Sequence, residues 1–308
     1  MKKKLYYYLF ILILISANSH SNSNVYIQVT VNDEIITNYD IKKEETYLKV
    51  LNPELINLNE KRRLTIAKNS LINEIIKKSE LKRVFNIEKQ LPKVNDVFKD
   101  FYKRLNFKSE EEFKKSLSKN NYSIDKIKNK LKIEILWNRL IVRKYKNQVK
   151  INKKSLLKKI NDDKNKIKSE FLLSEIFFRK KKNKSLNVLV KEIKKSIKEI
   201  GFSNTANIYS ISASANFGGN IGWIEQDNLS KKIFAELNKI DKEQHTNVIQ
   251  VGNEFLILKV EDKKSKEVTF NAELKLNEMI NFETNKQLNQ FSNIHFRKVK
   301  INYSIDEK

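Results

Sequence analysis

The sequence predicts an α+β protein with a mostly helical module and a smaller mixed module. Three observations predict it. After an opening strand, apolar residues recur at helical spacing to about residue 150. From Glu170 onward, strand patterns alternate with amphipathic helices. Residues 265–308 read as one helix and one strand that cannot bury their apolar faces alone, so we expect them to pack back on the helical module.

The first 21 residues have the layout of a secretory signal peptide. Three lysines, Lys2 to Lys4, precede an apolar run from Leu5 to Ile15, and small residues follow as far as Ser21. A helix of that apolar run is too short for a hydrocarbon core of about 30 Å. We therefore expect cleavage, export to the periplasm and no stable membrane insertion of the mature chain. An uncleaved N-terminus that tethers an assembly factor is the alternative.

Charge and cysteine content exclude several classes of function. The formal net charge is +25, but lysine is spread evenly with asparagine and isoleucine and forms no basic block interleaved with aromatic residues. This pattern favours solvated basic faces and no nucleic-acid partner. The chain has no cysteine, which excludes disulfides, lipid attachment at cysteine and zinc–thiolate sites. We expect neither a metal nor a cofactor.

The helical module is predicted element by element. Alternation over Val25–Val31 indicates a strand, and Thr37 or Asn38 can cap a helix from Tyr39. Ser123 begins a long helix, and Lys153 to Ser169 read as a connecting helix. Two further helices each show one apolar face; these faces comprise Leu64, Ala67, Leu71 and Ile75 in the first, and Val94, Val97, Phe98, Phe101 and Leu105 in the second.

The second module follows a β-α-loop-β-α-β-β order. FLLSEIFF is an apolar strand, and Gly201 ends the amphipathic helix after it. NIGWI is a strand, LSKKIFAELNKI a helix, and VIQV and EFLILKVED are two closing strands. Beyond them, AELKLNEMINFETNKQLNQF is helical and RKVKINYSID alternates as a final strand.

Glycine is concentrated in one loop. The chain has 5 glycines, yet Gly218, Gly219 and Gly222 lie within five positions. Because glycine adopts positive φ freely and lets backbone segments approach closely, this loop is the predicted site of a demanding geometry.

The loop carries a family resemblance. YSISASANFGGNIGWIEQDNL, from Tyr209 to Leu229, resembles the signature of parvulin-type (PpiC) peptidyl-prolyl isomerases, and the likeness runs to Val260. VNDEIITNYDI resembles the start of the N-terminal domain of SurA-type periplasmic chaperones, and the terminal helix and strand resemble the segment that returns to it. The implied organisation is a signal peptide (1–21), a SurA-like helical chaperone domain (22–168), a parvulin-like domain (169–264) and a returning segment (265–308).

The resemblance also locates the isomerase pocket. The two family histidines fall on Glu175 and Leu256, and the family Cys or Asp falls on Ser212. On the apolar shelf, the Met falls on Leu229 and the Phe on Asn238. A carboxylate cannot replace the donor and acceptor of a neutral imidazole, and a buried unpaired carboxylate is costly, so we expect Glu175 to face water. Because both histidines, the Cys and the Phe are replaced together, we expect isomerase activity to be lost.

Further expectations concern the three histidines, Ser212 and Trp223. None of His20, His245 and His295 falls in the pocket register. Ser212 is expected to act as a turn residue. Trp223 is expected to anchor the core below the glycine loop, with a client contact as the alternative.

The resemblance implies an ATP-independent holdase for unfolded periplasmic polypeptides, among them outer-membrane β-barrel precursors. Candidates for an apolar client groove are Phe98, Phe101, Tyr102 and Phe107, although burial is the better expectation for Phe98 and Phe101 because they lie on the repeating helix face. An active isomerase with a rearranged pocket is the alternative.

Overall fold

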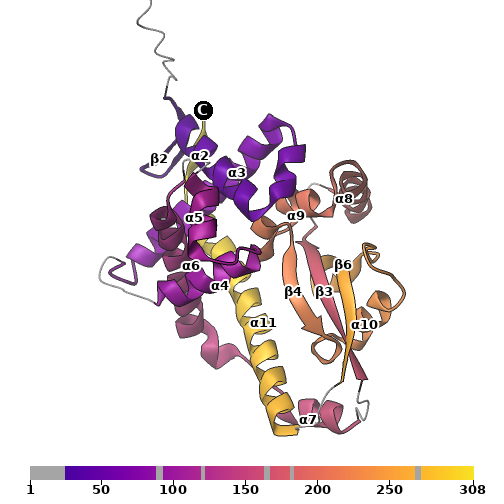
Figure 1. Ribbon diagram of the computed structural model, residues 1–308. Coiled ribbons are helices and arrows are strands. Elements are labelled where there is room, and N and C mark those ends of the chain that lie inside the picture. The colour runs from indigo at the N-terminus through magenta and orange to yellow at the C-terminus, as the bar shows by residue number, and fades with distance from the viewer. Residues whose placement is uncertain (1–24, 88–92, 119–121, 163–166, 181–183, 268–271) are drawn as a thin grey trace, which may run out of the picture.

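The computed structural model describes residues 25–87, 93–118, 122–162, 167–180, 184–267 and 272–308. It confirms the predicted α+β class. A helical module and an α+β module lie side by side, and the long helix α11 (Ala272–Lys300) runs along the boundary between them (Figure 1). The predicted signal peptide lies outside the described residues. No helix in the described ranges is long and apolar enough to span a membrane.

The helical module begins with a hairpin and a well-capped helix. The Thr37 hydroxyl accepts from the Asp40 backbone N–H, and the Asp40 carboxylate accepts from the Thr37 N–H, which confirms the expected cap. The elements are β1 (Ile27–Val31), β2 (Glu34–Thr37), α2 (Asn38–Leu51), η1 (Pro53–Asn57), α3 (Glu60–Lys82), α4 (Val94–Arg104), α5 (Glu110–Ser118), α6 (Ile124–Tyr145), η2 (Lys146–Gln148) and α7 (Lys153–Asp162).

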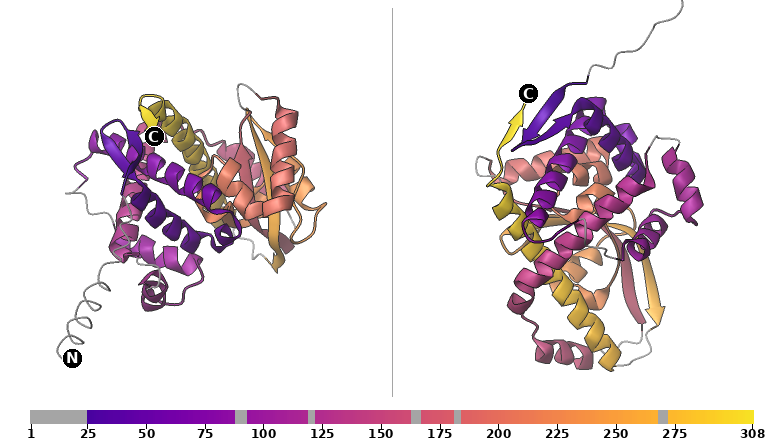
Figure 2. Two further views of the ribbon diagram at one scale, coloured as in Figure 1. Left: turned by 90° about the horizontal axis from the view of Figure 1, so that it is seen from above. Right: turned by 90° about the vertical axis from the view of Figure 1, so that its left-hand side faces the viewer.

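The end of the chain completes this module, as the fold class predicts. Strand β7 (Ile305–Glu307) pairs antiparallel with β1, which gives the sheet order β2-β1-β7 (Figure 2). Val299 and Tyr303 are buried in the same core as Val29 and Val31. Helix α11 also packs on α6. Residues from the two ends of the chain therefore share one hydrophobic core.

The α+β module has a four-stranded antiparallel sheet in the order β4-β3-β6-β5. On one face of β3, Ile176 and Phe178 pack with α8 and α9; on the other, Phe171 and Leu173 pack with α10. The elements are β3 (Ile167–Phe178), α8 (Leu186–Ile200), α9 (Phe202–Tyr209), η3 (Ala213–Phe217), β4 (Asn220–Glu225), η4 (Gln226–Asn228), α10 (Lys231–Leu237), β5 (Ile249–Val251) and β6 (Glu254–Glu267).

Three element boundaries differ from the sequence prediction. The connecting helix ends at Asp162, and Ser169 already lies in β3. Residues 202–209 were expected to belong to a loop but form helix α9. The sequence does not mark the start of this helix, because it follows Gly201 directly and has no side-chain cap. The C-terminal segment stays helical to Lys300, so its strand is only three residues long. Alternation alone does not separate a strand from the last turns of a packed helix.

The two modules contact each other near the glycine loop. The Asn52 side-chain amide donates to Asn207 Oδ1 at 2.6 Å. The ring of Phe217, at the end of η3, meets the ring of Phe101 edge-on at a centroid distance of 6.3 Å. These contacts hold the loop against α2 and α4.

A second contact between the modules lies near the start of α11. Lys275 is buried and pairs with Glu225 and with Asp227, the latter at 3.1 Å. Lys168 of β3 reaches the same Asp227 carboxylate at 2.6 Å. The start of α11 is therefore bound to the α+β module through a shared cluster of charges.

The two tryptophans test the role of α11 in the helical core. Trp137 is 1% exposed and donates to Ser292 Oγ of α11 at 2.9 Å, whereas Trp223 is 41% exposed. We expect Trp137→Ala to lower the free energy of unfolding by about 3–5 kcal/mol and Trp223→Ala by less than about 1 kcal/mol. Urea unfolding followed by circular dichroism measures both, and similar losses would contradict this assignment.

Candidate functional site

A large cleft lies between the two modules. Its volume is about 2230 Å³, and its walls come from α3, α4, α6 and α11 on one side and from β3, β4, β6 and the glycine loop on the other. Cavities that bind small molecules typically measure about 300–1,000 Å³. This cleft is large enough for a stretch of polypeptide.

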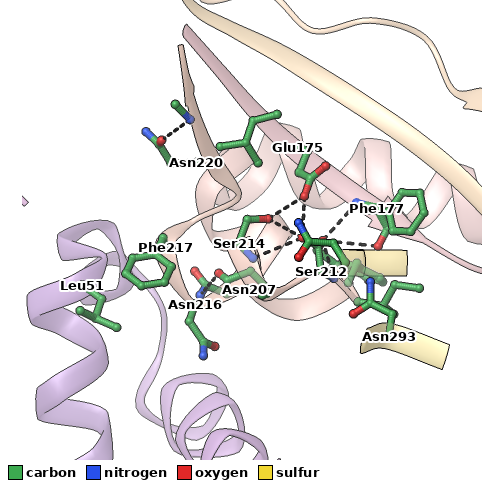
Figure 3. Close-up of a pocket in the computed structure, with 18 of the residues that line it drawn as sticks. Leu51, Glu175, Phe177, Asn207, Ser212, Ser214, Asn216, Phe217, Asn220 and Asn293 are labelled. Carbon is green, nitrogen blue, oxygen red and sulfur yellow. Dashed lines mark hydrogen bonds between the residues drawn. The ribbon is translucent and has the colours of Figure 1, made fainter. Parts of the chain in front are cut away.

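Glu175 lies on the floor of the cleft. It shares a β3 face with Leu173 and Phe177, and all three line the cavity. Its Oε1 accepts from Ser212 Oγ at 2.5 Å and from Ser214 Oγ at 2.9 Å (Figure 3). The expectation that Glu175 faces bulk water is therefore wrong: the side chain is half-buried and held in place by two hydroxyl groups.

Burial changes the acidity of this carboxyl group. Removal from water raises the pKa of Glu175 above its usual value, and the bonds from Ser212 and Ser214 partly offset the rise because they favour the ionised form. Ser212 also accepts from the Ser214 backbone N–H, the bond expected of a turn residue. Ser212 thus shapes the loop and positions the carboxylate.

The glycine loop approaches β3 too closely for any side chain. Gly218 and Gly219 have φ of 65° and 85°. A Cβ on Gly219 would collide with the carbonyl oxygen of Glu175, and one on Gly218 would collide with Ser203. Gly222 has open space around it but also a positive φ of 80°. The glycines are therefore required by the backbone, independently of any catalysis.

An apolar shelf adjoins the carboxylate. Leu229 and Leu256 both line the cleft, together with Ile233 and Leu258. Asn238 lies outside it, exposed at the end of α10. The structure thus brings Glu175, Ser212, Leu229 and Leu256 into one cavity but leaves Asn238 apart.

Trp223 lines the cleft from β4. The expectation that it anchors the core is wrong because 41% of its surface is exposed. The Lys264 ammonium lies 4.0 Å from the centroid of its ring. Strand β4 is an edge strand, so its side chains have a neighbouring strand on one side only.

The aromatic candidates for a client groove are mostly core residues. Phe98 and Phe101 are buried, as expected, and Tyr102 is buried as well. Phe107 is half-buried against the same core, and its ring lies 4.9 Å from that of Phe113 at a tilt of 55°. Phe101 lines the cleft but Phe98, Tyr102 and Phe107 do not, so these four residues do not together form an apolar groove on it.

Histidine does not supply the missing imidazoles within the described residues. His245 contacts the backbone of Thr246, and His295 is buried against Trp137 and Tyr145. Neither lines the cleft. His20 lies outside the described residues.

Comparison with known proteins identifies the second module. Residues 170–262 match the family model described as "Rotamase: PPIC-type PPIASE domain". The α+β module is a PpiC-type domain. A solved PpiC-type isomerase domain is 24% identical, and the match covers 33% of this chain and 96% of that chain at a TM-score of 0.29. No curated protein matched the chain.

Longer solved chains also matched. One comes from work on PEB4 and a second periplasmic protein of Campylobacter jejuni, described as SurA-like chaperones; it is 17% identical over 92% of this chain and 98% of that one, at a TM-score of 0.35. PrsA from Bacillus subtilis is 16% identical over 91% and 93%, at a TM-score of 0.31.

One missed feature was available in the sequence. In FLLSEIFF, strict alternation places Glu175 on the same face as Leu173 and Phe177, which predicts a carboxylate on a packed face. The serines that satisfy it come from the loop more than thirty residues later, and no spacing rule links the two segments.

The raised pKa of Glu175 gives a stability test. A carboxyl group whose pKa is raised on folding stabilises the folded state below its unfolded pKa, and that contribution is lost as pH rises through the folded value. We therefore expect Glu175→Gln to gain stability relative to the natural protein as pH rises from about 4 to 7. Urea unfolding at several pH values measures the difference; a flat or falling difference would show that the carboxylate is effectively hydrated.

Proposed function

We propose that this chain is an ATP-independent periplasmic holdase that keeps unfolded exported polypeptides, outer-membrane β-barrel precursors in particular, from aggregating. The observation that carries the proposal is the cleft of about 2230 Å³ between the modules. A client in transit exposes apolar residues and unpaired strand edges, and a surface that covers them prevents self-association. The predicted signal peptide supports a periplasmic location, and the net charge of +25 favours the approach of acidic clients.

We further propose that the PpiC-type domain has lost isomerase activity. Isomerisation must lower a barrier of about 20 kcal/mol set by amide resonance, which requires polar groups matched to the twisted imide. Glu175 and Leu256 occupy the positions of the two family histidines, and Oε1 of Glu175 is already engaged by two serines. The domain then serves as a wall of the client cleft.

A second candidate function is isomerase activity with a rearranged pocket. The observation that favours it is the adjacency of a hydrogen-bonded carboxyl group at Glu175 and an apolar shelf at Leu229 and Leu256. A neutral carboxyl group can donate a hydrogen bond to a reacting group, and burial raises the pKa of Glu175 in that direction.

Aggregation assays test the chaperone proposal. We expect the mature chain, at a small molar excess, to suppress light scattering by an unfolded β-barrel protein diluted from denaturant, and a variant lacking residues 169–264 to protect less because it lacks one wall of the cleft. An inert globular protein at equal mass is the control. No protection by the full chain refutes the proposal, and equal protection by the shortened chain places the binding surface in the helical module alone.

A proline-peptide isomerisation assay separates the two candidates. We expect the rate with the purified chain to equal the uncatalysed rate, because the family's pocket histidines are absent from their positions. A clearly faster rate that Ser212→Ala or Leu229→Ala abolishes would establish the second candidate. A rate that neither variant changes would point to a contaminating isomerase.

A further inference from the structure

Helix α11 presents a row of carboxamides to the cleft. Asn285, Asn289 and Asn293 recur every fourth residue, and all three line the cavity. Residues four apart share a helix face. Figure 3 draws Asn293 on the α11 side of the pocket that also contains Ser212 and Glu175. Within the described part of the chain, no hydrogen bond joins these three amides to another residue.

Two other helices add carboxamides to the same side of the cavity. Asn69 and Asn73 of α3 are also four residues apart and line the cleft, as does Asn138 of α6. Asn73 accepts from Lys300 Nζ at 3.2 Å. Carboxamide groups from three helices therefore line the helical side of one cavity.

The chemistry and spacing of the α11 row match an extended backbone. A carboxamide offers an acceptor oxygen and an N–H donor, as a peptide group does. Four residues of helix rise about 6 Å. In an extended chain, peptide groups on the same edge recur every two residues, about 6.6–6.8 Å apart. The rise between Asn285, Asn289 and Asn293 along the helix axis is therefore close to the spacing of three successive same-edge peptide groups.

We propose that the Asn285–Asn289–Asn293 row binds client polypeptide in extended form by hydrogen bonding to its backbone, independently of side-chain sequence. The inference rests on the proposed holdase function and specifies how the cleft recognises a client. Phe282 and Phe296, which also line the cleft on α11, add apolar contact near the two ends of the row.

The chain contains a matched control for this row. Asn277 and Asn281 continue the same four-residue spacing and are exposed, as Asn285 and Asn289 are, but they lie outside the cleft because the helix turns further with each step. Leucine has nearly the shape of asparagine without its hydrogen bonds. We therefore compare Asn285→Leu/Asn289→Leu/Asn293→Leu with Asn277→Leu/Asn281→Leu, after circular dichroism has shown that both full-length variants are folded.

The probe is a labelled peptide of alternating apolar and polar residues, about twelve residues long, with a second version N-methylated on alternate residues to remove N–H donors from one edge. We expect the natural protein to bind the methylated peptide about tenfold more weakly. The triple variant should lose about tenfold in affinity for the unmodified peptide and no longer distinguish the two. The control pair should behave as the natural protein does.

Two outcomes overturn the inference. Unchanged or tighter binding by the triple leucine variant would show that the cleft acts through apolar surface, and equal binding of both peptides by the natural protein would show that the backbone is not read. These outcomes differ from failure of the holdase proposal, in which the natural protein neither suppresses aggregation nor binds either peptide.

Discussion

The close approach of Gly219 to strand β3 is the constraint on which the cleft depends. The Glu175 N–H donates to the Gly219 carbonyl at 2.8 Å, a distance that no side chain at position 219 would permit. With the loop held there, Ser212 and Ser214 lie against the Glu175 carboxylate, and Phe217 lies against the helical module. This backbone contact thereby positions the floor of the cavity and one of the contacts between the modules.

The groups that line this cavity suit binding better than bond rotation. The Glu175 carboxylate on the floor accepts hydrogen bonds from Ser212 and Ser214 of the glycine loop, and α11 contributes Asn285, Asn289 and Asn293 to the wall. Isomerases need polar groups aimed at a single twisted bond, whereas a carrier of many different chains gains from repeated groups that fit any backbone. The polarity of the wall also limits self-association, because a large exposed apolar patch would attract other copies.

The sequence predicts the local features of this structure better than the long-range ones. The Thr37 cap, the Gly201 helix end and the positive-φ glycine loop each depend on a few adjacent residues, and the structure contains all three. The burial of Tyr102 and the exposure of Trp223 depend on which segments pack above them, and no local period records that. Helix α9 was not predicted because it has no side-chain cap. The half-buried position of Glu175 was not predicted because its serine partners are remote in sequence.

The pairing of β1 with β7 has a consequence for how the molecule is assembled. Strand β1 pairs with β2 at once but obtains its second neighbour, β7, only after residues 305–307 have been synthesised, whereas every strand of the α+β sheet is available before α11 begins. The α+β module can therefore fold first. Pairing β7 with β1 carries the entropic cost of joining two distant points of the chain. The core of the helical module, which includes Val299 and Tyr303, can therefore close only after α11 and β7 have been synthesised.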